Sequence, residues 1–325
     1  MKRLVFLITL ILIFTLIFHP APAVGKVTRM VITTGSTGAN MYIFAIAMTK
    51  IWHKKVKGVS FSVQSSAGQT ENMKLLAKNE VEFGFIASPE APEAMEGTGR
   101  FKGQGDLFKK MRGIYAYPYG GIQYVTLADS RITKMSDLKG KKISIGAPGS
   151  VGATLFNPLI LKEHGITKDN ATFMYLAPNV SGDQLKNFQI DALAFMTYPP
   201  IAQVTDVATV RKIRQLSLEE DAIQRIVKQI PGTYKETTPA KVYGKNQVNT
   251  EDIQTIGYSV IFATIEDIEA NLIYSLTKAF WENIQEFHKS HVLAKMVIQK
   301  NFMRGMTVPL HKGAERYYKE VGWIK

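Results

Sequence analysis

Short apolar segments alternate with amphipathic segments from residue 27 onward. Strands are predicted at 28–33, 59–64 and 82–87, and helices between them at 39–54 and 70–78. Ser88-Pro89 is typical of the start of a third helix, with Ser88 as its N-cap and Pro89 at its first position. This β-α-β-α-β-α alternation predicts a parallel sheet with helices on its faces, so the expected fold class is α/β.

The pattern changes at 113–128, where two β-rich segments flank Tyr119-Gly120-Gly121 without a helix between them. A short helix is predicted at 136–140 and further strands at 142–145, 172–176, 192–196, 212–216 and 255–263. Residues 150–163 predict a helix that Pro158 kinks. Ser217-x-x-Glu220 has the spacing of a capping box. Thr264-x-x-Asp267 indicates the start of a last helical region that extends to about residue 288.

The N-terminus has the three parts of a secretory signal peptide. Met1-Lys2-Arg3 is basic, residues 4–18 are apolar or Thr, and Ala21-Pro22-Ala23 offers small residues at a cleavage site. The alternative is an uncleaved anchor, but the apolar run is shorter than the roughly 20 residues that a spanning helix needs. We therefore expect residues 1–23 to be removed and the chain to be exported to the periplasm.

Composition narrows the function classes. A chain of 325 residues without Cys has room for two domains, but no disulfide framework, thiolate zinc site or Cys nucleophile. The net charge is +13, which favours anionic ligands or an anionic membrane surface. The basic residues are scattered and the chain carries an export signal, so nucleic acid is not expected as a partner.

A faint internal duplication links the sequences VITTGSTGANMY and ISIGAPGSVGATLF. Each is an apolar strand, a Gly/Ser turn and a helix that begins near Ala. Two α/β domains would then each present a helix N-terminus at the carboxyl end of a strand, where open α/β sheets bind ligands and where an anion is favoured. The alternative is that any strand–helix unit with a Gly turn has this form.

The sequence contains no persuasive catalytic set. The glycine spacings at 35–38 and 146–152 match neither a dinucleotide fingerprint nor a phosphate-binding P-loop. His288-x-x-His291 has no Glu between its histidines, and Pro-Gly-Ser-Val-Gly is not a nucleophile elbow. We expect no enzyme activity, no catalytic or metal-binding residues and no cofactor.

Five segments in this order resemble the TAXI-type periplasmic solute receptors of tripartite ATP-independent (TRAP) transporters: ITTGSTGANMY, VQSSAGQTENMKLLAKNEVEFGFIAS, ADSRITKMSDLKGKKISIGAPGSVGAT, IDALAFMTYPP and VPLHKGAERYYKEVGW. The resemblance implies a type II periplasmic binding protein fold, with two α/β lobes joined by crossing strands near 119–125 and 255–263. Lobe I would comprise 24–119 and 263–325, and lobe II 120–262. A monomer would bind a small organic anion or amino acid, glutamate- or 2-oxoglutarate-like, and deliver it to a TRAP membrane permease.

By family position, the resemblance implies lobe I ligand contacts at Ser36, Thr37, Gly38, Tyr42, Ser65, Asn72 and Ser88, and lobe II contacts at Ser150, Val151, Gly152, Thr154 and Tyr198. Helix capping is the alternative role for Ser65, Asn72 and Ser88, and a place in the core the alternative for Tyr42. An Arg clamp is the usual signature of carboxylate recognition. No Arg lies within the predicted contact loops, and Arg112 and Arg131 lie in sequence between the two sets of contacts. Three possibilities stay open: amides and hydroxyls hold the anion, a charge arrives from elsewhere in the fold, or the ligand is less anionic.

Two other functions are compatible with the same sequence. A ligand-sensing partner of a membrane kinase would use the same cleft, and only its docking surface would differ. An exported enzyme on a similar two-lobed fold would need a nucleophile and a base, for which the chain offers no persuasive pair.

The Ser150 loop provides the first test. Replacing Ser150 with Glu puts a bulky negative charge in the predicted anion site, so ligand binding should be lost while the chain still folds. Calorimetric titration and thermal unfolding measure the two properties. An unchanged ligand affinity would remove this loop from the site.

Overall fold

A computed structural model describes residues 27–35, 37, 40–148 and 150–325. The predicted signal peptide (1–23) and two predicted ligand contacts, Ser36 and Gly38, lie outside the described residues. No helix in the described part of the chain is both long and apolar enough to cross a membrane.

Ten strands and eleven α-helices are described. The strands are β1 (Thr28–Thr33), β2 (Val59–Gln64), β3 (Phe83–Ala87), β4 (Met111–Leu127), β5 (Lys142–Ser144), β6 (Thr172–Met174), β7 (Ala192–Met196), β8 (Ile213–Leu216), β9 (Thr233–Thr238) and β10 (Ile253–Ile265). The helices are α2 (Asn40–Lys55), α3 (Gln69–Ala77), α4 (Ala91–Glu96), α5 (Gly105–Phe108), α6 (Asn157–Glu163), α7 (Pro178–Lys186), α8 (Ala202–Val210), α9 (Glu220–Gln229), α10 (Ala270–Glu282), α11 (Ile284–His288) and α12 (Lys312–Glu320). Short helical turns include η1 (Gly99–Phe101), η3 (Met135–Leu138) and the π-helical η4 (Gly152–Phe156).

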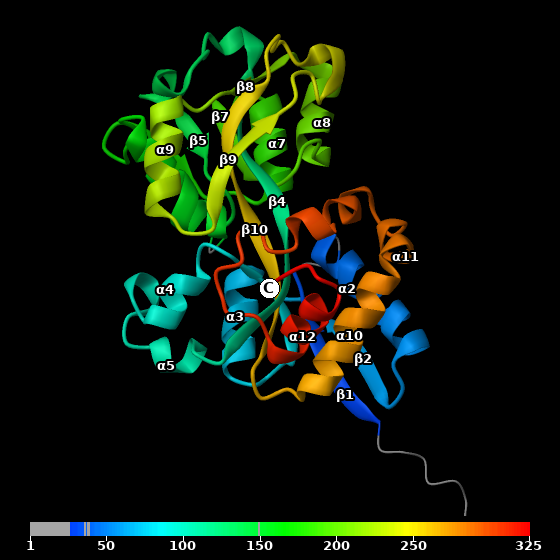
Figure 1. Ribbon diagram of the computed structural model, residues 1–325. Helices are drawn as coiled ribbons and strands as arrows, with labels where there is room; N and C mark the ends of the chain where they lie inside the picture. Colours follow the sequence, from blue (N-terminus) through cyan, green and yellow to red (C-terminus); the bar gives the residue numbers. More distant parts are fainter. Residues whose placement is uncertain (1–26, 36, 38–39, 149) are drawn as a thin grey trace, which may run out of the picture.

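The strands are arranged in two lobes (Figure 1). In lobe I, β2, β1 and β3 are parallel and β10 pairs with β3 in the antiparallel sense. In lobe II, β6, β5 and β7 are parallel and β4 lies antiparallel to β7 and β8. Helices α2–α5 and α10–α12 belong to lobe I, and α6–α9 to lobe II (Figure 1). The expected α/β fold with two lobes is therefore confirmed.

The two long strands β4 and β10 connect the lobes and pair with each other from Met111–Ile265 to Gly121–Gly257. Their register shifts between Tyr258 and Ser259, opposite Tyr119, so an irregularity lies where the chain passes from one lobe to the other. The crossing strands predicted at 119–125 and 255–263 are parts of β4 and β10. The predicted lobe boundaries fall inside the same two strands.

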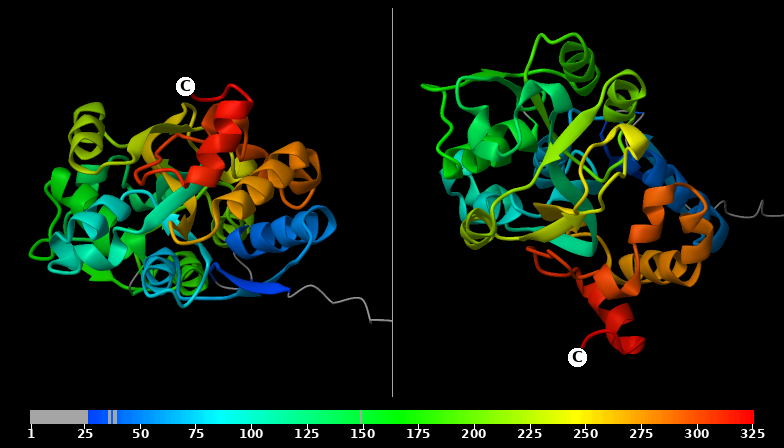
Figure 2. Two further views of the ribbon diagram at one scale, coloured as in Figure 1. Left: turned by 60° about the horizontal axis from the view of Figure 1, so that its bottom comes forward. Right: turned by 90° about the horizontal axis from the view of Figure 1, so that it is seen from above.

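An aromatic cluster forms the core of lobe I. Phe83 and Phe262 stack with their ring centroids 5.6 Å apart, and Tyr115 lies 5.5 Å from Phe262. Helices α2 and α10 lie side by side over this cluster (Figure 2). The buried Trp52 of α2 donates its indole N–H to the Leu276 carbonyl of α10 at 2.9 Å, which satisfies the one polar group of that ring.

Several helix starts differ from the predictions. Ser88 is not an N-cap: α4 begins three residues later, at Ala91, and the buried Ser88 hydroxyl bonds to Gly232 and Ser259 instead. The capping box at Ser217 is also wrong, because the Ser217 hydroxyl accepts the Gln254 N–H and α9 starts after Glu219. In both cases a neighbouring strand competes for the hydroxyl group that the local pattern assigns to a cap.

Two further predictions about element ends fail because strands run farther than expected. Residues 111–127 form the single strand β4 rather than two segments. Thr264 is a buried residue of β10 that donates to the Glu82 carbonyl at 2.8 Å, and α10 starts at Ala270 with Glu269 as its N-cap. Near Pro158 the helical segment changes type: the π-helical turn η4 ends at Phe156 and α6 begins at Asn157.

Gly120 provides a test of the hinge. Its φ is +111°, and a Cβ there would lie 2.3 Å from the backbone nitrogen of Tyr198. Gly58 also has a positive φ, +77°, but a Cβ there meets open space. We expect Gly58→Ala to cost about 1 kcal/mol of unfolding free energy from backbone strain alone, and Gly120→Ala at least about 2 kcal/mol more. Urea unfolding of the two variants measures the difference, and equal losses would show that the hinge has room for a side chain.

Candidate ligand-binding site

A cavity of about 690 Å³ lies between the lobes, within the usual range for small-molecule sites. Lobe I contributes the start of α3 and the η1 turn, lobe II contributes the 145–152 loop, η4 and the end of β7, and the hinge strands contribute two tyrosines. The lining residues are Met41, Ala67, Gly68, Gln69, Thr70, Glu71, Lys74, Arg100, Phe101, Tyr119, Ile145, Gly146, Ala147, Ser150, Val151, Gly152, Thr154, Asn157, Pro178, Ala194, Phe195, Met196 and Tyr258.

The hinge wall of the cavity is aromatic. The rings of Tyr119 on β4 and Tyr258 on β10 lie 5.4 Å apart, and Phe156 of lobe II lies 5.5 Å from Tyr258. The Tyr258 hydroxyl donates to the Gln69 Oε1 atom at 3.0 Å, so the hinge is tied to the start of α3. Burial raises the pKa of Tyr258 well above its ordinary value, and the phenol therefore remains a hydrogen-bond donor at neutral pH.

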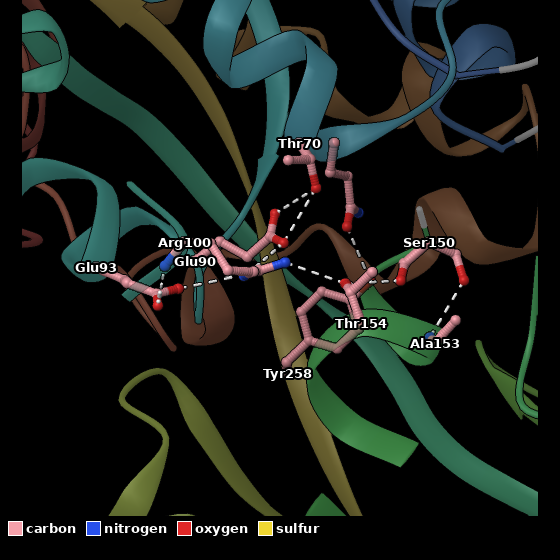
Figure 3. A network of polar contacts seen from close by, with 9 residues as sticks. Thr70, Glu90, Glu93, Arg100, Ser150, Ala153, Thr154 and Tyr258 are labelled. Atoms are coloured by element: carbon pink, nitrogen blue, oxygen red, sulfur yellow. Dashed lines mark hydrogen bonds and ion pairs between the residues drawn. The ribbon is translucent and has the colours of Figure 1, made fainter. Parts of the chain in front are cut away.

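A buried carboxylate lies behind the lobe I wall. Glu90, at the N-cap of α4, is fully buried, and its carboxylate accepts the Thr70 hydroxyl at 2.8 Å (Figure 3). Its charge is balanced by Arg100, whose Nη2 atom lies 2.8 Å from the Glu90 Oε1 atom. A buried ion needs such a partner, because removal from water costs far more than one ordinary hydrogen bond returns.

Glu93 fixes the turn that carries Arg100. Its Oε1 atom accepts the Arg100 backbone N–H at 2.9 Å, and its Oε2 atom lies 3.4 Å from Arg100 Nη2. The Glu93 side chain occupies the space beside Gly99, where a Cβ would lie 1.5 Å from Oε1. Gly99 has a positive φ of +48°, so the turn favours glycine, and a side chain there would also displace the Glu93 carboxylate from Arg100.

Arg100 also reaches lobe II. Its Nη1 atom donates to the Thr154 hydroxyl oxygen at 3.0 Å (Figure 3). The Thr154 hydroxyl proton is donated to the Ser150 carbonyl at 2.9 Å, which leaves a lone pair on the Thr154 oxygen for Arg100. The guanidinium therefore links a buried carboxylate of lobe I to a hydroxyl of lobe II at the edge of the cavity. The Arg100 side chain is 32% exposed.

Four of the predicted contacts line this cavity together: Ser150, Val151, Gly152 and Thr154. The predicted lobe I contacts are placed differently. Thr37 and Tyr42 line a second hollow of about 500 Å³ between α2 and α11, and Ser65 is exposed on the loop before α3. The part of lobe I that does line the cavity is the end of this same connection together with the start of α3, residues 67–70.

Three other predicted contacts lie away from the cavity, and two of them make internal hydrogen bonds. Asn72 is fully buried, donates to the Thr34 and Phe85 carbonyls, and accepts the hydroxyls of Thr33 and Ser66, so all four of its hydrogen-bonding positions are used. Ser88 joins the Gly232 and Ser259 backbones, as described above. Tyr198 is partly buried near Tyr234 and Arg304, and burial raises its pKa. None of the three is among the residues that line the cavity.

Four lining residues were not expected from the sequence: Gln69, Arg100, Tyr119 and Tyr258. One open possibility was that a charge arrives from elsewhere in the fold. Arg100 lines the cavity, although neither Arg112 nor Arg131 does. Gly97, Gly99 and Gly103 around Arg100 indicate a turn, but only the fold shows what that turn faces. Among the described residues no group of three or more His, Asp or Glu side chains is placed to hold a metal ion.

Two lobes, two shared strands and a cavity between the lobes define the fold of periplasmic binding proteins. Residues 32–322 match the NMT1-like family, and the chain belongs to that family. A solved structure from Bordetella bronchiseptica RB50 has the same fold, with 15% identity, a TM-score of 0.53, and coverage of 91% of this chain and 98% of that one.

More distant matches include two structures whose binding is described. The periplasmic aliphatic sulphonate binding protein SsuA from Escherichia coli is 12% identical, with a TM-score of 0.49, and the match covers 91% of this chain and 79% of SsuA. DctP7, a Bordetella pertussis extracytoplasmic solute receptor binding pyroglutamic acid, is 12% identical, with a TM-score of 0.47 and coverage of 91% and 94%. The aliphatic sulphonate is the ligand named for SsuA, and pyroglutamic acid is the ligand named for DctP7.

The Glu90–Arg100 pair generates a prediction. Arg100→Met leaves a buried carboxylate without its cation, and we expect a loss of about 2 kcal/mol in the free energy of unfolding, at the low end for such pairs because Arg100 is partly exposed. Adding Glu90→Gln should recover most of that loss, since the uncompensated charge is removed with it.

Lys110→Met is the matched control, because the Lys110–Asp267 pair is half-exposed on both sides. Its loss should be much smaller than that of Arg100→Met, because solvent screens the exposed pair. Chemical denaturation of the four proteins gives the comparison, and a double variant less stable than Arg100→Met would contradict the coupling.

Proposed function

We propose that this protein is a solute receptor that captures a small organic solute in the cavity between its lobes. The observation that carries the proposal is the composition of the cavity wall, which combines residues of lobe I, lobe II and both hinge strands. A solute bound there contacts both lobes at once. The NMT1-like family and the two-lobed fold support this function over catalysis.

Binding in such a cavity is coupled to lobe movement. A ligand that touches both walls binds the closed arrangement more tightly than an open one, and it therefore shifts the hinge equilibrium toward closure. The irregular register of β4 and β10 at Tyr258 and Ser259 is where the two lobes rotate. The Arg100–Thr154 hydrogen bond adds a direct contact between lobes that opening must break.

The proposal extends to the transport system. The five sequence segments that resemble TAXI-type receptors support delivery of the solute to the membrane permease of a TRAP transporter. The signal-peptide pattern of residues 1–23 supports a periplasmic location, and the same resemblance suggests a monomer. Within the same proposal the ligand is a small organic anion or amino acid, for which the resemblance suggests glutamate or 2-oxoglutarate, and Ser150–Thr154 contact it together with Arg100 and Gln69.

The experiment is a ligand search on the chain from Val24 to Lys325. The purified protein is denatured and the supernatant analysed by mass spectrometry for a trapped solute. Refolded protein is then screened by thermal shift against amino acids, mono- and dicarboxylates, sugars and sulfonates. A ligand at 100 times its dissociation constant adds about 2.7 kcal/mol to the native state, a readily measured shift.

Two charge-matched variants identify the site of binding. The stabilisation should disappear in Ser150→Glu, which puts the charge inside the cavity, and persist in Thr209→Glu, which puts the same charge on the exposed end of α8. Stabilisation that survives in Ser150→Glu would place the ligand elsewhere. The absence of both a trapped solute and a thermal shift with every class would contradict the receptor function.

A further inference from the structure

The charged side chains of the cavity all lie on one wall. Among the described lining residues, the charged ones are Glu71 and Lys74 on α3 and Arg100 on η1, all in lobe I. The described lining residues of lobe II are all uncharged. Residue 149 of the same loop lies outside the described residues and is a glycine, which has no charged side chain. The cavity therefore has an ionic side and a neutral side.

Most of the neutral side is apolar. Ile145, Val151, Ala194, Phe195 and Met196 present hydrocarbon, ring and thioether groups from lobe II. The aromatic rings of Tyr119 and Tyr258 continue this surface onto the hinge. A wall of this kind favours an apolar part of a ligand, because contact with it removes apolar surface from water.

The polar groups on the lobe II wall are largely committed to one another. The backbone N–H groups of Ser150, Ala153 and Thr154 donate to Ala147, the Ser150 hydroxyl and the Ser150 carbonyl. Asn157 donates to the Ile145 carbonyl and accepts the Tyr124 hydroxyl. The described lining residues of lobe II bring no charged side chain to this wall, so a full charge placed there would have no ion-pair partner on lobe II.

The ionic side carries both signs of charge. Arg100 is already held by Glu90 and Glu93, while Lys74 and Glu71 are exposed on the first turns of α3. Glu71 uses one oxygen to accept the Ala67 N–H. This mixture of charges suits a compact head group that contains a carboxylate, with or without an adjacent ammonium. In this part of the cavity such a head group finds side chains of opposite charge to pair with.

We propose that the solute is a carboxylate with its charge confined to one end and an apolar body, such as a branched-chain or aromatic amino acid or 2-oxo acid. The head group binds the lobe I wall at Lys74 and Arg100, and the apolar body lies against lobe II and the hinge. This assignment rests on the proposed receptor function. It departs from the dicarboxylate that the sequence resemblance suggests, because a second carboxylate would face the uncharged wall.

Matched pairs of solutes test the inference. Leucine has an apolar side-chain end, whereas glutamate has a charged one. In the same way, 4-methyl-2-oxopentanoate has an apolar end and 2-oxoglutarate a charged one. Titration calorimetry on ligand-stripped protein should show at least tenfold tighter binding of the apolar member in whichever pair binds. Binding of the amino acid rather than the 2-oxo acid would show that an ammonium group is recognised as well.

A variant can reverse the preference. Met196→Lys puts a cation on the neutral wall and should reduce the apolar-over-dicarboxylate ratio at least tenfold, whereas Val210→Lys adds the same charge to an exposed site on α8 and should leave the ratio unchanged. Should Met196→Lys fail to fold, the wild-type ratios still decide the matter.

The outcomes separate the two claims. Tighter binding of glutamate or 2-oxoglutarate by the wild-type protein, or binding of a solute without a carboxylate, overturns the inference and leaves the receptor function intact. Failure of every pair to bind, together with no solute released on denaturation, overturns both.

Discussion

The antiparallel pairing of β4 with β10 is the constraint on which the rest of the molecule depends. The two strands supply the edge on which each lobe builds its parallel sheet: β3 pairs with β10 in lobe I, and β7 pairs with β4 in lobe II. Both strands are almost entirely buried, so their backbone groups must be satisfied by pairing. The same two strands bring Tyr119 and Tyr258 to the wall of the cavity. The interruption in their register is therefore at once the junction of the lobes and one wall of the site.

A buried charge explains how the mouth of the cavity is organised. Glu90 has no exposed surface, so the fold must keep a cation beside it, and this requirement holds Arg100 at the edge of lobe I. Once its Nη2 atom is fixed on Glu90, the guanidinium plane directs Nη1 toward Thr154 in lobe II. The interlobe contact thus follows from an electrostatic need inside lobe I. A lysine would not replace Arg100 fully, because its single ammonium lacks the planar, forked arrangement of donors.

The sequence predicted what depends on local pattern and missed what depends on contact across the fold. The strands at 28–33 and 59–64 follow from hydrophobic patterning, which also found strand segments inside β4 and β10 but not their full lengths. The hydroxyls of Ser88 and Ser217 were misassigned as caps because their actual partners lie on strands far away in the chain. The Ser150 loop was predicted correctly as a turn at a strand end, and it lines the cavity. Arg100 had no comparable signal, because its place in the cavity depends on its ion pairs with Glu90 and Glu93.

The one-sided charge of the cavity also bears on the order of events during capture. The exposed Lys74 and Glu71 on lobe I can pair with the head group of a solute while the lobes are apart. The apolar wall of lobe II contributes only when it covers the body of the solute, and that requires closure. In the proposed receptor, initial binding would therefore depend on salt concentration and on lobe I, whereas the stability of the closed complex would depend on the hydrocarbon surface that lobe II covers. A solute with a second charge at its far end would satisfy the first step and oppose the second, which is how a cavity of this composition discriminates between solutes of similar size.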